Sequence, residues 1–238
     1  MRKSLFVVLT LFGIYNSILA QSPWYVGGSA GVCVSKTSIN DTLANSFSTR
    51  NRIGGYGNLR ITYDMNRASS LEFSLGFLNT GYKINNDTMA YNTSVSKSIS
   101  SWNSSLGISF RQNFSEYNFI SEKFGVAVNY NAFSNATDTL NNKDKAHDFR
   151  IIQTLNSTIY PMFYIGFAMG GKTDGGDRYE INLTYQQSFG TSHLLEVQHG
   201  EFYNQQFPLT FRGGNLQLGL SYFFNFGNFE KSEEYFYD

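Results

Sequence analysis

The residues of this chain with the greatest capacity for chemistry are five charged side chains on the polar positions of alternating segments: Arg60, Glu72, Arg111, Arg178 and Glu180. In a β-strand successive side chains point to opposite faces, so all five are expected on the polar face of one sheet. Arg60 and Glu72 lie almost symmetrically about a turn at residues 65–68, which makes them near cross-strand neighbours. The sequence therefore predicts a buried charge network, in which Glu72→Ala would cost roughly 1–3 kcal/mol because Arg60 loses a partner.

A second group of reactive residue types lies near position 195: Ser192, His193, Glu196 and His199. A serine, a histidine and a carboxylate are the side chains that nucleophilic catalysis uses. However, His193 and Glu196 differ in parity and would face opposite sides of a regular strand. Together with His147, these histidines form no repeated spacing with a carboxylate on one face, so no metal site is predicted. We expect no catalytic residue, no cofactor and no enzymatic activity.

The segment that best defines the fold is the last alternating one, residues 215–226. Its even positions are all large and apolar, and they end in aromatic residues: Leu216, Leu218, Leu220, Tyr222, Phe224 and Phe226. Its odd positions are polar or small, apart from Phe223. Such a period of two predicts a β-strand with one apolar and one polar face, and an apolar face that ends in aromatic residues is typical of strands in outer-membrane barrels.

Seven earlier segments repeat this alternation, and they are separated by connections that are in turn long and short. The alternating segments are residues 24–35, 52–63, 71–77, 102–111, 124–130, 151–169 and 179–189, and the long polar connections are residues 36–49, 85–93 and 134–148. Long loops at one end and tight turns at the other are the pattern of an all-β, antiparallel, up-and-down transmembrane β-barrel. The polar positions would then line its interior, including the single cysteine, Cys33, as a small buried filler.

The number of barrel strands depends on how residues 151–169 are interpreted. Their unbroken alternation favours one tall strand and a barrel of eight strands. Pro161 lacks an N–H to donate, and a break there together with a separate strand at residues 193–200 would give ten strands. We expect eight, with Pro161 inside a strand and residues 170–177 at the periplasmic end.

Composition and the first residues indicate export. Arg2 and Lys3 precede a short apolar run from Leu5 to Ile14, and the small residue Ala20 stands at the expected cut, which predicts a signal peptide at residues 1–20. Only 15% of residues are charged, and the one cysteine excludes an internal disulfide. Without the first 20 residues the chain has 16 basic and 18 acidic residues, so nothing favours a nucleic acid as partner. We expect a barrel at residues 21–226 and a short periplasmic tail at residues 227–238.

With these features the chain resembles the small outer-membrane barrels of the OmpA and OmpX type, without the peptidoglycan-binding domain that often follows such a barrel. The closing strand also resembles the recognition sequence of the barrel-insertion machinery, through Gln217, Gly219, Tyr222 and Phe224. The resemblance implies the outer membrane of a Gram-negative cell envelope, with its lipid and lipopolysaccharide as partners. It implies a structural or surface-recognition role with a lumen filled by side chains, and leaves the extracellular ligand unidentified.

A narrow porin-like channel is the alternative function. A lipid-modifying enzyme is a third, since barrel enzymes of that kind pair a histidine with serine and carboxylates near the outer strand ends.

A short repeat marks the three long polar connections. Each contains Asp-Thr before an aliphatic residue, with the threonines at Thr42, Thr88 and Thr139. The triplet resembles an acceptor sequence for bacterial O-glycosylation of exported proteins, while turn chemistry is the alternative explanation. All three copies are expected in loops and none in a strand.

Overall fold

A computed structural model describes residues 24–35, 47–66, 68–86, 93–131, 137–141, 149–199 and 205–226 of this chain. In these residues the backbone forms only β-strands, turns and irregular segments, and no helix is long and apolar enough to span a membrane. The strands are β1 (Trp24–Ser35), β2 (Phe47–Arg50), β3 (Arg52–Asp64), β4 (Ser69–Asn86), β5 (Thr93–Asn113), β6 (Asn118–Tyr130), β7 (Thr137–Asn141), β8 (Phe149–Leu155), β9 (Ile159–Lys172), β10 (Arg178–Ser188), β11 (His193–His199), β12 (Gln205–Phe211) and β13 (Asn215–Asn225).

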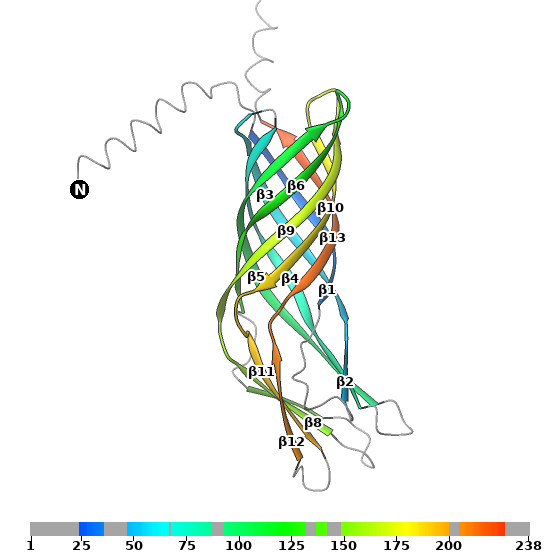
Figure 1. Ribbon diagram of the computed structural model, residues 1–238, viewed down its shortest axis with the longest axis vertical. Coiled ribbons are helices and arrows are strands. Elements are labelled where there is room, and N and C mark those ends of the chain that lie inside the picture. The colour runs from blue at the N-terminus through cyan, green and yellow to red at the C-terminus, as the bar shows by residue number, and fades with distance from the viewer. Residues whose placement is uncertain are drawn as a thin grey trace, which may run out of the picture.

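Eight of these strands close into an antiparallel barrel (Figure 1). The order around the barrel is β4, β3, β1, β13, β10, β9, β6 and β5, and the pairing of β4 with β5 completes the ring. Every pairing in the ring is antiparallel, and the first and last barrel strands, β1 and β13, lie side by side. The prediction of an all-β, up-and-down barrel with eight strands is confirmed.

The barrel is apolar outside and polar inside, the reverse of a water-soluble protein. On β13, Leu218 and Leu220 expose 51% and 66% of their surface, whereas Gln217 and Ser221, which flank them in the sequence, are buried. The other barrel strands also alternate between exposed apolar and buried polar residues, because the pleat of a strand directs neighbouring side chains to opposite faces. The exterior of the barrel is thus an apolar belt, and its lumen is filled with polar and charged side chains.

One end of the barrel carries tight turns. Short hydrogen-bonded turns join barrel strands there, at residues 65–66 and 68, 114–117 and 173–177, and Phe226 N donates to Trp24 O at the same end. Residues 170–172 belong to β9, so the turn after it is shorter than the sequence suggested. Pro161 lies inside β9, opposite Val128 of β6, as expected for eight strands.

At the other end four strands form a second sheet, in the order β12, β11, β8 and β7 (Figure 1). This sheet has an apolar core that it shares with the projecting ends of β4 and β5: Tyr82, Ile84, Val95, Ile99, Ile151, Leu195, Val197, Leu209 and Phe211. The expectation of one unbroken strand over residues 151–169 is therefore wrong. Residues 156–158 interrupt it, and the backbone N–H groups of Asn156 and Ser157 donate to Ser192 O where the chain passes from the second sheet to the barrel. Residues 193–199 form a separate strand, β11, without adding to the barrel.

Candidate functional site

The centre of the lumen near the tight turns holds four buried charges, Arg60, Glu72, Lys123 and Glu180, which we call the charge quartet. They come from four strands, β3, β4, β6 and β10, so the quartet crosses the barrel. Glu72 lies 2.5 Å from Arg60 Nη2 and 3.2 Å from Lys123 Nζ. Glu180 Oε2 lies 2.6 Å from Lys123 Nζ and 3.4 Å from Arg60 Nη1. Each cation thus contacts both carboxylates, and the quartet has no net charge.

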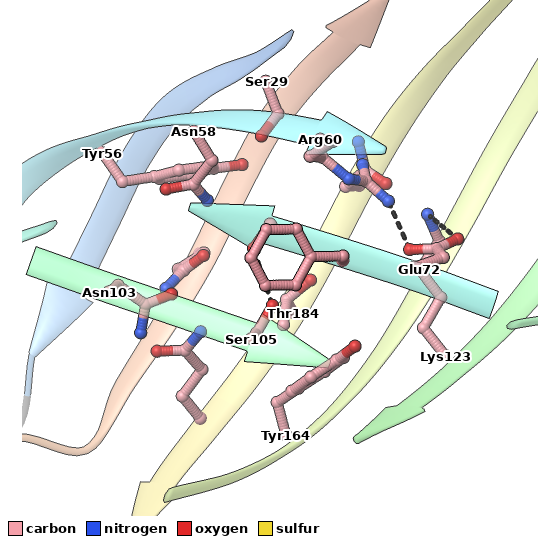
Figure 2. A pocket seen from close by; sticks show the side chains of 15 residues that line it. Ser29, Tyr56, Asn58, Arg60, Glu72, Asn103, Ser105, Lys123, Tyr164 and Thr184 are labelled. Carbon is pink, nitrogen blue, oxygen red and sulfur yellow. Dashed lines mark hydrogen bonds and ion pairs between the residues drawn. The ribbon is translucent and has the colours of Figure 1, made fainter. Parts of the chain in front are cut away.

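Figure 2 shows Arg60, Glu72 and Lys123 pointing toward one another across the lumen. Arg60 Nη1 also donates to Ser221 Oγ at 2.9 Å, and its guanidinium lies 4.8 Å from the ring centre of Phe223. That contact explains why Phe223 alone breaks the polar face of the closing strand. Charges this deeply buried are tolerated only when each has partners on several sides, which this ring of contacts supplies.

A second charged group, the Asp64 triad of Asp64, Arg111 and Arg178, lies closer to the tight turns. Asp64 accepts hydrogen bonds from Arg111 Nη2 at 3.0 Å and from Arg178 Nη2 at 2.8 Å. The Arg178 guanidinium also lies 3.9 Å from the ring centre of Tyr25, and that of Arg111 lies 5.0 Å from the ring centre of Phe119. Two cations share one carboxylate, and cation–π contacts supply part of the remaining stabilisation.

The five charges that the sequence singles out therefore divide between two tiers. Arg60, Glu72 and Glu180 enter the quartet, whereas Arg111 and Arg178 enter the Asp64 triad, and none of the described contacts joins the two tiers directly. Sequence reasoning missed Asp64 and Lys123, which complete both tiers. Their positions in the alternation could have revealed them. Asp64 is an even-numbered residue of the same strand as the inward Arg60 and Thr62, and Lys123 is an odd-numbered residue of the same strand as the inward Gly125 and Ala127.

Beyond the quartet lies a small polar cavity of about 50 Å³. Residues from opposite walls line it, among them Tyr56, Asn58, Asn103, Ser105, Tyr164 and Thr184 (Figure 2). The side-chain oxygens of Asn58 and Asn182, both at this cavity, are buried and lack a hydrogen-bond partner among the described residues. A cavity of this size and polarity accommodates a few water molecules.

On the far side of the cavity, amide side chains form a second hydrogen-bonded layer. Asn103 Nδ2 donates to Asn129 Oδ1 at 2.5 Å, and Asn129 Nδ2 donates to the hydroxyl of Tyr160 at 3.1 Å. Gln217 Nε2 donates to Asn215 Oδ1 at 2.8 Å from the opposite wall. The cavity thus lies between an ionic layer and an amide layer.

The serine and histidine group near position 195 does not converge. Ser192 and His193 are fully buried; Ser192 Oγ lies 3.1 Å from His193 Nδ1 and donates to Phe211 O at 2.9 Å. Glu196 lies on the other face of β11, where it accepts a hydrogen bond from Gln198. His199 ends β11, but its side chain and all of His147 lie outside the described residues. The described residues contain no group of three or more metal-ligating side chains.

Burial of His193 predicts an acid-sensitive second sheet. Burial lowers the pKa of His193 to about 4, from about 6.5 in the unfolded chain. Between these values the unfolded state binds the extra proton, so stability is present above pH 6.5 and falls toward pH 4, by about 2 kcal/mol at pH 5. Hydrogen exchange of β11 at pH 7.5 and pH 5 measures this difference. In His193→Gln the pH-dependent part should disappear; an unchanged slope would show that other groups cause it.

The remaining predicted residues lie as follows. Gln217 and Gly219 face the lumen, whereas Tyr222 and Phe224 are exposed on the apolar belt; their role in insertion stays a prediction. Thr42 and Thr88 lie outside the described residues. The expectation that all three Asp-Thr triplets lie in loops is wrong for Thr139, which pairs with Ile152 inside β7. Glycosylation of Thr139 also stays a prediction. The residue lies in a strand at the edge of the second sheet, and this location does not itself exclude modification.

Comparison with known proteins finds no matching family model and no matching curated protein. Among solved structures, the chain is similar to the outer membrane protein OprG from Pseudomonas aeruginosa, with 8% identity, a TM-score of 0.47 and coverage of 85% of this chain and 96% of that one. It is also similar to Ail, the attachment invasion locus protein of Yersinia pestis, with 14% identity, a TM-score of 0.39 and coverage of 84% and 98%. The fold itself follows from the strand pairing described above: an antiparallel, up-and-down barrel of eight strands.

Proposed function

We propose that this protein is an integral outer-membrane barrel with a sealed lumen, which holds a folded sheet outside the membrane for surface recognition. The observation that carries the proposal is the inverted distribution of polarity. Large apolar side chains cover the outside of the barrel, while two tiers of buried ion pairs fill its inside. Exposed apolar surface of this extent is stable in a bilayer and would aggregate in water.

The dimensions of the belt support a bilayer location. Phe77, Trp102 and Tyr130 form one row across three neighbouring strands and bound the belt on the side of the second sheet. On β5 the belt runs from Trp102 to Phe110, which at about 3.3 Å per residue and about 40° tilt spans roughly 20 Å. This is close to the apolar band of roughly 25 Å in such barrels, and aromatic residues at its borders suit the headgroup region.

The second sheet supports the recognition role. Its apolar core, which it shares with the projecting ends of β4 and β5, is separate from the lumen, so we expect the sheet to remain folded outside the membrane. The sheet extends beyond the aromatic row, and its strand order leaves β12 and β7 at its two edges. A rigid sheet displayed in this way presents a defined surface to molecules outside the cell, which a set of polar loops alone would not.

Cysteine labelling of whole cells tests this orientation. We expect Thr154→Cys, exposed on β8, to react with a membrane-impermeant maleimide, and Lys172→Cys, at the end of β9, to react only after lysis. The wild-type chain provides the background, because its single cysteine, Cys33, is buried in the barrel. Surface labelling at Lys172 without labelling at Thr154 would reverse the proposed orientation.

A narrow channel is the second candidate function, and the polar cavity is the observation that favours it. The quartet borders the cavity on one side and amide side chains border it on the other, so we expect the wild-type protein to show no sustained conductance in planar bilayers. Glu72→Ala opens the quartet and should produce brief conducting events, while the matched variant Glu122→Ala on the outer face should not. Stable wild-type channels would favour the channel function instead.

A further inference from the structure

The inward-facing charges at the tight-turn end of the lumen do not balance. The Asp64 triad has one carboxylate for two guanidinium groups, and Lys172, the last residue of β9, is a further cation beside it. Electrostatic interactions link the Lys172 ammonium group with Asp64 and with both arginines of the triad. Three cations therefore accompany one carboxylate, whereas the charge quartet deeper in the lumen is neutral.

Two of these cations are direct cross-strand partners. Arg178, the first residue of β10, pairs with Lys172 next to the turn at residues 173–177, and the alternation of both strands directs the two side chains into the lumen. Like charges directly opposite each other destabilise a sheet. None of the described ion pairs includes Lys172, and Arg178 shares Asp64 with Arg111. An anion between Lys172 and Arg178 would offset this surplus of positive charge.

The carboxylates in the tight turns do not supply that anion. Asp177 Oδ2 accepts a hydrogen bond from the hydroxyl of Tyr222 at 2.8 Å, and Asp177 Oδ1 accepts one from Asn225 N at 3.0 Å. Tyr222 is exposed on the apolar belt, so these bonds hold Asp177 on the outer side of the barrel. Asp174 and Glu116 are exposed, and no described ion pair includes any of the three carboxylates.

Buried hydrogen-bond donors of the triad also lack partners. Arg111 donates to Asp64 through both Nη atoms, at 3.2 and 3.0 Å, whereas the described hydrogen bond from Arg178 to Asp64 uses Nη2. The Nε atoms of both arginines are buried and have no hydrogen-bond partner among the described residues. The same holds for the hydroxyl of Ser121, the cross-strand partner of Arg111. A guanidinium with an unused N–H group is suited to bind a further oxyanion.

We propose that Lys172 and Arg178 form a binding site for one small oxyanion, a phosphate or carboxylate group, at the tight-turn end of the lumen. The anion would lie between the Lys172 ammonium group and the Arg178 guanidinium. It would enter past Lys172, because Lys172 is partly exposed and Arg178 is fully buried. The site faces the lumen and not the lipid, and it is independent of the recognition role proposed for the second sheet at the opposite end.

Two sources could supply such an anion. The first is a soluble anion in the surrounding solution. The second is the chain itself, because residues 227–238 follow β13 at this end and contain one lysine and four acidic residues: Glu230, Glu233, Glu234 and Asp238. Both would bring the same chemical group to the same two cations, so binding measurements with and without these acidic residues separate the two sources.

Calorimetric titration of the refolded full-length chain with inorganic phosphate, in phosphatidylcholine nanodiscs at constant ionic strength, tests the site. We expect saturable binding of one phosphate per chain. Binding to the wild type would identify a soluble anion as the occupant. Binding only after Glu230, Glu233 and Glu234 are changed together to Gln would identify a carboxylate of the chain itself.

Substitutions of Lys172 locate the bound phosphate. Lys172→Gln should weaken binding roughly tenfold or more in whichever form of the chain binds, because it removes one charge-assisted contact. Lys172→Arg keeps the positive charge and should retain binding. Lys83→Gln removes the same charge at the opposite end of the barrel and should leave the affinity unchanged. Heat-modifiable mobility in gels shows that each variant is folded before it is titrated.

Three results would overturn the proposal. Absence of saturable phosphate binding both in the wild type and in the chain without the three glutamates would show that the two cations form no anion site. Equal weakening by Lys172→Gln and Lys83→Gln would indicate an effect of total charge alone. Undiminished binding to folded Lys172→Gln would place the anion elsewhere on the barrel. None of these results bears on the recognition role, which the labelling of Thr154→Cys tests separately.

Discussion

Glu72→Ala is expected to destabilise the barrel by about 3–5 kcal/mol, more than a single ion pair would suggest. Glu72 contacts both Arg60 and Lys123, so its removal leaves two buried cations with Glu180 as their only carboxylate partner among the described residues. An uncompensated charge in a confined interior retains its desolvation cost without the attraction that offset it. Urea unfolding of the refolded barrel in lipid vesicles, followed by tryptophan fluorescence, measures the change.

Glu122→Ala is the matched control for this variant. Glu122 neighbours Lys123 on β6 but is exposed on the opposite face, so its loss should change the free energy of unfolding by no more than about 0.5 kcal/mol. A double-mutant cycle of Glu72→Ala with Arg60→Ala should show strong coupling, because both residues belong to one ring of contacts. Equal effects at Glu72 and Glu122, or additive effects at Glu72 and Arg60, would mean that the quartet does not stabilise the barrel.

Asp64→Ala is expected to be at least as damaging, at about 3–5 kcal/mol or more. Asp64 is the one carboxylate that the described contacts place between Arg111 and Arg178, and these two residues are 5% and 1% exposed. Its loss brings two buried guanidinium groups together with no negative charge between them. The same unfolding measurement in vesicles applies.

Adding Arg178→Gln to Asp64→Ala should recover part of this loss, because it removes one of the two repelling charges. Asp174→Ala, in the exposed turn at the same end, controls for the removal of an aspartate and should be nearly neutral. If the second substitution added further destabilisation instead of relieving it, electrostatic repulsion would not be the cause.

Much of the barrel can be predicted from alternation alone, because each barrel strand has a polar lumen on one side and an apolar exterior on the other. Trp24–Ser35 is predicted and observed as one strand, and the closing strand Asn215–Asn225 ends one residue from its predicted limit. The inward direction of Arg60, Glu72, Arg111, Arg178 and Glu180 follows from the same rule, because parity fixes the face of every residue in a regular strand.

The tertiary structure decided which charges meet. Asp64 and Arg178 are separated by 114 positions in sequence, yet their side chains are 2.8 Å apart. Their contact depends on the closure of the barrel and on the position of each inward-facing residue along the barrel axis. Parity gives the face of a residue but not its partners across the lumen, so the division into a quartet and a triad could not be derived from the sequence.

The second sheet was also decided only in three dimensions. Odd-numbered residues are apolar through much of residues 151–169, and this pattern crosses the break at residues 156–158 without a change. In β8 the odd side chain of Ile151 is buried in the core of the second sheet, whereas in β9 the odd side chains of Ile159 and Ile165 are exposed on the apolar belt. A protein core and the apolar exterior of a barrel both contain apolar side chains, so the sequence determined that this face is apolar, and only the fold determined which of the two places each residue occupies.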